Sequence, residues 1–211
     1  MYKRQTFLFA QQKAKKIEVI DMVKDLIITK KEISNVKQSW WVPNEYWRIA
    51  LSDSPTIGEE VILDIEEKLQ GYSLFSIVHS EITPAGGFEK KDASVTIIND
   101  QSILSPIPEE EIPTDILELI NILRPTLASM VGQLGEQMIF YVFKNELEDG
   151  TTIISPFNTG KLTLKINDTD FIYPLPLQSM VEKKVCPKDQ ELLSGNWEYC
   201  PWHGVKLTEQ N

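Results

Sequence analysis

The chain has 211 residues, of which 42% are hydrophobic and 25% are charged, as expected for a globular protein with one full domain and a small module. It contains no run of about 18 apolar residues, so the sequence predicts no membrane-spanning helix. The net charge of −10 disfavours general nucleic-acid binding, because an acidic surface repels phosphate groups.

The charge is unevenly distributed along the chain. Residues 1–39 carry a net charge of +5, residues 40–179 carry −14, and residues 180–211 carry −1. The basic first segment is interpreted as a solvated amphipathic helix or as a segment that docks on the acidic body or on an acidic partner. Its short apolar stretch does not resemble a secretory signal, and two cysteines fit a reducing compartment. A cytoplasmic location is therefore expected.

In the first third of the chain, two helices flank an aromatic cluster. Residues 10–28 place apolar side chains at helical spacing and predict an amphipathic helix. Residues 57–70 predict a second helix with Thr56 as its N-cap and an acidic outer face. Large aromatic side chains are mostly buried, so a core position is favoured over an exposed partner surface for the four aromatics between these helices. They are Trp40, Trp41, Tyr46 and Trp47.

The middle of the chain predicts strands and one long helix. Residues 72–83 and 93–98 are rich in β-forming residues and could pair as a hairpin. Thr114 is expected to cap a third helix, which should kink or restart near Pro125. Residues 138–143 are almost wholly apolar and predict a central strand that is buried on both faces.

Two further segments complete the main body. Residues 162–166 alternate apolar and polar side chains, and residues 171–173 run back after a turn, which predicts a hairpin. The fold class is therefore expected to be α+β, with a mainly antiparallel sheet covered by two or three helices. This domain is expected to span residues 1–176, and a small β module is expected to span residues 180–207.

The only two cysteines lie in this predicted module. The chain reads Cys186-Pro187-Lys188-Asp189 and, ten residues later, Cys200-Pro201-Trp202-His203-Gly204. A two-residue gap lets both ligands of one turn face the same ion, and thiolate, imidazole and carboxylate groups all bind zinc. Proline after each cysteine and glycine after the histidine favour tight turns.

This segment, residues 184–207, resembles the zinc-ribbon family, in which C-P-x-C-G turns hold one structural zinc ion. The resemblance implies a ligand set of Cys186, Asp189, Cys200 and His203. Aspartate departs from the usual choice of ligand, and His79 or a water molecule could replace it. Three states stay open: a zinc-bound module, a metal-free module that persists on packing alone, and a Cys186–Cys200 disulfide.

Two classes of function follow from these observations. The favoured class is a non-enzymatic interaction or assembly protein that binds an unknown protein partner or a second copy of itself, with neither nucleic acid nor membrane as a partner. The alternative is an enzyme or small-ligand-binding protein with a pocket around His79, Glu81 and Arg124. Convergence of these three side chains would favour the alternative.

Overall fold

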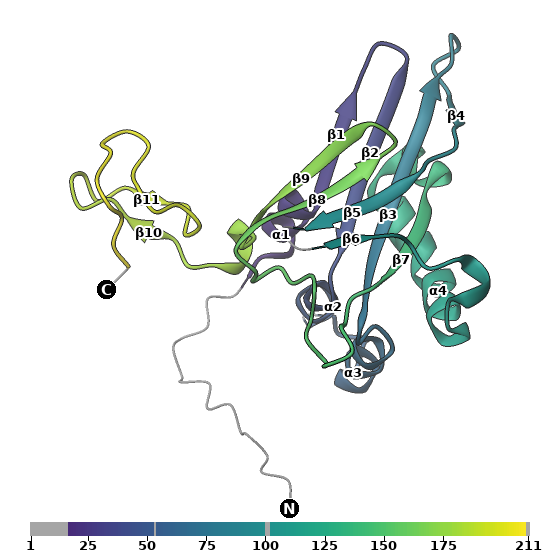
Figure 1. Cartoon of the computed structure of the whole chain (residues 1–211), viewed down its shortest axis with the longest axis horizontal. Helices are drawn as coiled ribbons and strands as arrows, with labels where there is room; N and C mark the ends of the chain where they lie inside the picture. The colour runs from purple at the N-terminus through teal and green to yellow at the C-terminus, as the bar shows by residue number, and fades with distance from the viewer. Residues whose placement is uncertain (1–16, 53, 100–101, 210–211) are drawn as a thin grey trace, which may run out of the picture.

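The computed structural model describes residues 17–52, 54–99 and 102–209, and it has an α+β fold built mostly from antiparallel strands (Figure 1). Its main body contains two sheets rather than the single sheet that was expected. The first sheet has the order β1-β2-β3-β4, with β7 also paired to β3. These strands are β1 (Ile27–Lys31), β2 (Asn35–Val42), β3 (Tyr72–Ile82), β4 (Phe88–Lys90) and β7 (Ile139–Lys144).

The second sheet lies against one face of the first and has the order β6-β5-β8-β9. Its strands are β5 (Val95–Asn99), β6 (Ser102–Leu104), β8 (Gly160–Ile166) and β9 (Thr169–Leu175). The hairpin predicted near residues 162–173 is confirmed as β8 and β9, paired from Ile166↔Thr169 to Gly160↔Leu175.

Aromatic side chains fill the space between the two sheets. The rings of Trp41 and Phe75 stack with centroids 6.0 Å apart, and Tyr173 of the second sheet meets Trp41 edge-on at 5.7 Å. The Tyr173 hydroxyl lies 2.7 Å from Ser39 Oγ on the opposite sheet. Burial raises the pKa of Tyr173 well above its usual value, because a phenolate would lose its hydration there.

Helices lie on the other face of the first sheet. Trp40 of β2 meets Tyr46 of α2 edge-on, and Arg124 of α4 lies over the ring of Phe140 on β7. The expected core position of the four clustered aromatics is confirmed, because all are at most 3% exposed. The α-helices are α1 (Val19–Leu26), α2 (Asn44–Leu51), α3 (Glu59–Lys68) and α4 (Thr114–Met130). Short 3-10 turns occupy Glu109–Glu111, Gly132–Gln137 and Gln178–Met180.

The helix boundaries differ from the expectations at several points. The part of the first predicted helix before residue 17 lies outside the described residues, and α1 gives way to β1 at Ile27. Gly58 and Pro113 occupy the N-cap positions of α3 and α4 without side-chain caps, so neither Thr56 nor Thr114 caps its helix. Helix α4 also continues through Pro125 instead of restarting there.

Two predictions of strand pairing are wrong. The 72–83 and 93–98 segments do not form a hairpin, because β3 turns into the short β4 while β5 joins β8 in the second sheet. Strand β7 is not central, since it pairs only with β3 among the described strands. The Ile107 amide donates to the Val142 carbonyl at 2.8 Å, so a loop covers part of the free edge of β7.

The C-terminal residues form a separate small hydrophobic cluster. Its buried members are Cys186, Leu193, Cys200 and Leu207, with Val205 packed against them. Residues 176–183 lead from β9 to this cluster, and Asn196 Nδ2 donates back to the Pro176 carbonyl at 3.4 Å. The domain boundaries at 176 and 180 stay a prediction, and the two clusters are consistent with them.

Candidate metal centre

Two turns of matching geometry build the C-terminal site. In the first, the Cys186 amide donates to the Glu191 carbonyl and the Gln190 amide donates to the Cys186 carbonyl, both at 2.9 Å. In the second, the amides of Cys200 and Gly204 make the equivalent bonds to Val205 and Cys200, both at 2.8 Å. Each cysteine therefore begins a turn that folds back on itself and directs the next few side chains toward one point.

The last residue of each turn has a left-handed backbone. Gly204 has φ +63° and Gln190 has φ +64°. Glycine adopts this conformation easily, whereas a residue with a side chain does so at a cost. The glycine of the second turn was expected from the sequence, whereas Gln190 was not, because glutamine is not a typical residue for a left-handed position.

Short strands hold the two turns together. Strands β10 (Lys184–Val185) and β11 (Leu192–Leu193) flank the first turn and pair antiparallel. The chain returns after the second turn through bridges from Tyr199 to Lys206 and from Val185 to Thr208. The module is thus closed by backbone hydrogen bonds on both sides of the two cysteines.

Three potential metal ligands converge in this module. The ligand atoms of Cys186, Cys200 and His203 all lie within 4.8 Å of one another. His203 Nδ1 is 3.4 Å from Cys186 Sγ and 3.5 Å from Cys200 Sγ. With Zn–S near 2.3 Å and Zn–N near 2.0–2.1 Å, a tetrahedral site separates sulfur and nitrogen by about 3.6 Å. The group could therefore hold a metal ion without a large rearrangement.

Asp189 lies beside this group of three. Its Oδ2 is 3.6 Å from His203 Nδ1, where a tetrahedral site would place oxygen and nitrogen about 3.4 Å apart. Its other oxygen, Oδ1, accepts a hydrogen bond from the Glu191 amide at 3.1 Å. One oxygen is thus held by the turn while the other faces the histidine. Asp189 is not among the residues whose ligand atoms all lie within 4.8 Å of one another, so the structure brings together three of the four predicted ligands.

The electrostatics of the site couple the carboxylate and the first thiol. Burial raises the pKa of Cys186, because a thiolate is poorly solvated there. A hydrogen bond with Cys186, followed by the one from the Glu191 amide, lowers the pKa of Asp189. Between these two groups, the proton is therefore held by the Cys186 thiol and not by the Asp189 carboxylate. A metal ion would have to displace this proton to bind the thiolate.

The module has little apolar burial apart from these groups. Two of its four buried core members are the cysteines, while several large side chains point outward. Trp197 and Tyr199, for example, are 43% and 55% exposed. Apolar packing alone therefore does not explain how the module is stabilised. Cys186 and Cys200 are both free thiols in this structure.

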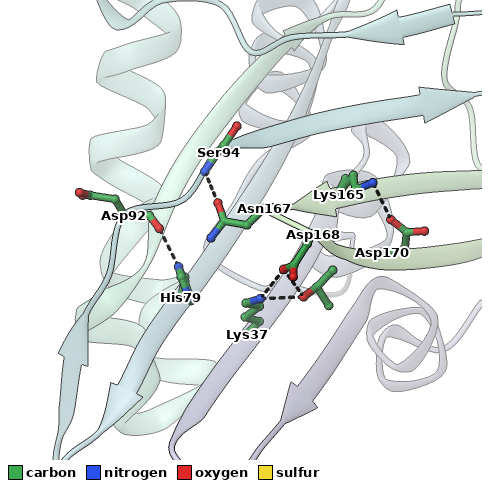
Figure 2. Close-up of polar contacts among 9 residues, drawn as sticks. Lys37, His79, Asp92, Ser94, Lys165, Asn167, Asp168 and Asp170 are labelled. Carbon is green, nitrogen blue, oxygen red and sulfur yellow. Dashed lines mark hydrogen bonds and ion pairs between the residues drawn. The ribbon is translucent and has the colours of Figure 1, made fainter.

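His79 lies far from this site in the fold, on β3 of the main body. Figure 2 shows its ring beside the 92–94 segment, where Nδ1 lies 2.7 Å from the Asp92 carbonyl oxygen. A carbonyl can only accept, so Nδ1 carries the proton and donates. Lys37, its neighbour across β2 and β3, reaches the turn between β8 and β9, where its Nζ lies 2.6 Å from Thr169 Oγ1. These contacts connect the ends of the two sheets.

The other two residues of the alternative pocket do not join His79 in one place. Glu81 shares a sheet face with His79 and forms an ion pair with Lys91 at 2.7 Å. Arg124 donates to the Met138 carbonyl and covers Phe140, which pairs with Ser76. Side chains alternate between the faces of a strand, so Phe140 and Arg124 lie on the face opposite His79. The three side chains do not converge.

Comparison with protein-family models, with curated proteins and with solved structures found no match to this chain. Among the described residues, the helices are too short or too polar to cross a membrane.

Proposed function

We propose that the chain is a non-enzymatic interaction or assembly protein of the cytoplasm whose C-terminal module is held together by one structural zinc ion. The observation that carries this proposal is the convergence of two thiols and an imidazole at the spacings of a tetrahedral site.

The donor set favours zinc over other common ions. Thiolate and imidazole groups suit zinc, whereas magnesium and calcium prefer oxygen ligands. With Cys186, Cys200 and His203 as three ligands, Asp189 Oδ2 is the nearest carboxylate for the fourth position. Four protein ligands would leave no position for a substrate or a catalytic water, which is typical of a structural zinc site.

The surface of the module supports a role in interaction. The module has a large exposed apolar surface for so short a segment. Its exposed fractions lie between 43% and 72% for Leu192, Trp197, Tyr199 and Trp202. Aromatic side chains are enriched at the centres of protein interfaces. We infer that the metal fixes the backbone while these side chains face a protein partner or a second copy of the chain.

The zinc site is tested by elemental analysis of the purified protein. The wild type is expected to carry one equivalent of zinc, and Cys200→Ser is expected to lose it because a hydroxyl is a poor zinc ligand. His79→Gln is a matched control, since it removes the other histidine and should retain the metal. Retention of full zinc by Cys200→Ser, or an absence of zinc from wild type reconstituted with the ion, would contradict the proposal.

The interaction role is tested by chemical cross-linking in the native host, followed by mass spectrometry and sedimentation analysis. Cross-links from the module to one partner or to a second copy are expected, and the double variant Trp197→Ala and Trp202→Ala should lose most of them. Ile122→Ala serves as the control, because Ile122 on α4 is as exposed as Trp202, at 72%. Equal cross-linking by all three proteins would count against an interface on the module.

A further inference from the structure

A wide groove lies along α2 and α3 and extends to Phe157 and Met180. It has a volume of about 800 Å³ and its apolar wall includes Ile49, Leu63, Phe157 and Met180. Leu63 and Phe157 are more than half exposed, at 51% and 54%. This surface, called the acidic groove below, combines exposed apolar side chains with a rim of glutamates.

The charges that line the acidic groove are unbalanced. They are Glu45, Glu66, Glu67 and Arg48, a net charge of −2. Arg48 is already neutralised, because its Nη2 lies 2.6 Å from Glu66 Oε2 and its Nη1 lies 2.6 Å from Glu59 Oε1. Glu45 and Glu67 form no ion pair with any described residue, so the groove has carboxylates available for an added cation.

Glu45 is a partly buried carboxylate that lines two cavities. It also lines a smaller cavity of about 230 Å³ that extends inward to Trp41 and Ser73. Burial raises its pKa, and the charge of Glu66 adds to the effect. An ionised carboxylate that is partly desolvated and has no cationic partner destabilises the fold, and such groups are concentrated at binding sites.

Arginine suits the Glu45 carboxylate better than lysine, because the planar guanidinium pairs with a carboxylate through two parallel hydrogen bonds.

We propose that the acidic groove binds a segment of a partner protein in which an arginine adjoins a large apolar residue. The guanidinium pairs with Glu45, and the apolar residue covers Leu63 and Phe157. The positive end of α2 opposes a cation, whereas the net negative charge of the groove favours one. None of the four predicted zinc ligands lines this groove, so binding there does not depend on a zinc ion.

The proposal is tested by selecting random peptides from a display library on the full chain and measuring the best binders by fluorescence anisotropy. Enriched peptides are expected to place arginine next to leucine, isoleucine, phenylalanine or tryptophan. Replacing that arginine with citrulline, which has nearly the same shape but no charge, should weaken binding about tenfold or more. Glu45→Gln should have a similar effect, whereas Glu60→Gln, exposed on α3 outside the groove, should change the affinity less than about twofold.

The same variant provides a stability measurement. A carboxyl whose folded pKa lies above its unfolded value destabilises the fold at neutral pH, and this penalty disappears as pH falls below the unfolded pKa. Glu45→Gln should therefore raise the melting temperature by about 1–3 °C at pH 7, and the gain should vanish below the ordinary pKa of 4.5.

Three results would overturn the proposal. The first is enrichment of peptides without arginine, and the second is unchanged binding by Glu45→Gln. The third concerns the competing occupant, because Ile17 also lines the groove and the preceding residues are basic. If replacing Lys13, Lys15 and Lys16 by glutamine tightens peptide binding about tenfold, the chain's own N-terminal residues occupy the groove. Cys200→Ser should bind the peptide normally, which separates this test from that of the zinc site.

Discussion

The main body and the C-terminal module are stabilised in different ways. The body encloses a continuous core between two sheets and a helical layer, with Trp40, Trp41 and Phe75 almost completely buried. The module buries two cysteines and two leucines and leaves its aromatics exposed. A domain with a large core distributes its stability over many contacts, whereas a small module concentrates it in a few groups.

This contrast explains why the chemically distinctive residues occur in the smaller region. A body of this size needs no bound ion to fold, so its two sheets can be assembled from ordinary apolar side chains. The module has few apolar side chains with which to hold its two turns together. Its sequence supplies one predicted ligand pair per turn, and Cys186, Cys200 and His203 lie close enough together to hold a metal ion.

The largest effect is expected from removing the zinc ion that we propose for the module. Structural zinc contributes on the order of 10 kcal/mol of apparent binding free energy in small modules. A chelator, or His203→Gln, should abolish hydrogen-exchange protection over residues 184–208 while the protection of β2 and β3 stays unchanged. His79→Gln should preserve both. Loss of protection in the body would show that the two regions fold as one unit and would end the comparison.

The complementary change is Trp41→Ala in the core of the body. Trp41 contacts Phe75 on the neighbouring strand and Tyr173 on the other sheet, so its removal leaves a large cavity and should destabilise the body by about 3–5 kcal/mol. Denaturant unfolding followed by tryptophan fluorescence measures the change. Zinc content should remain at one equivalent, and its loss in a still-folded protein would reveal coupling between the regions.

A smaller effect is expected where the two sheets share a buried hydrogen bond. Tyr173→Phe removes the partner of Ser39 Oγ, 2.7 Å away, and should cost about 1–2 kcal/mol because a buried hydroxyl loses its bond. Adding Ser39→Ala should cost less than the sum of the single changes. Strict additivity in this double-mutant cycle would indicate that the hydroxyls do not interact.

The smallest effects should distinguish the two turns of the module. A Cβ at Gly204 would meet no atom within 4 Å, so Gly204→Ala should destabilise only through its left-handed backbone, by about 1 kcal/mol. Gln190→Gly should relieve the same strain in the first turn and stabilise the module by about 0.5–1 kcal/mol. Chelator competition, which reports the apparent zinc affinity, measures both. A destabilising effect of Gln190→Gly, or no effect of Gly204→Ala, would mean that the two turns are not equivalent.

Local features of this protein could be predicted from its sequence. The cysteine spacing predicted two turns that face each other, and His203 does lie beside both cysteines. The apolar patterns of α3, β3 and the β8–β9 hairpin were also sufficient to predict those elements. Each of these predictions depends on residues close together in the chain, where backbone geometry limits the possible arrangements.

The partners of the strands depended on the tertiary structure. Apolar alternation shows which face of β5 is buried, but every strand offers the same backbone donors and acceptors, so the pattern does not select between β3 and β8. Likewise, no local signal connects Asn44, Glu45 and Phe157, which line one groove only because α2 and the 155–158 loop pack together. The sequence alone determined the turns and the faces of the elements; long-range packing decided which faces and which charges meet.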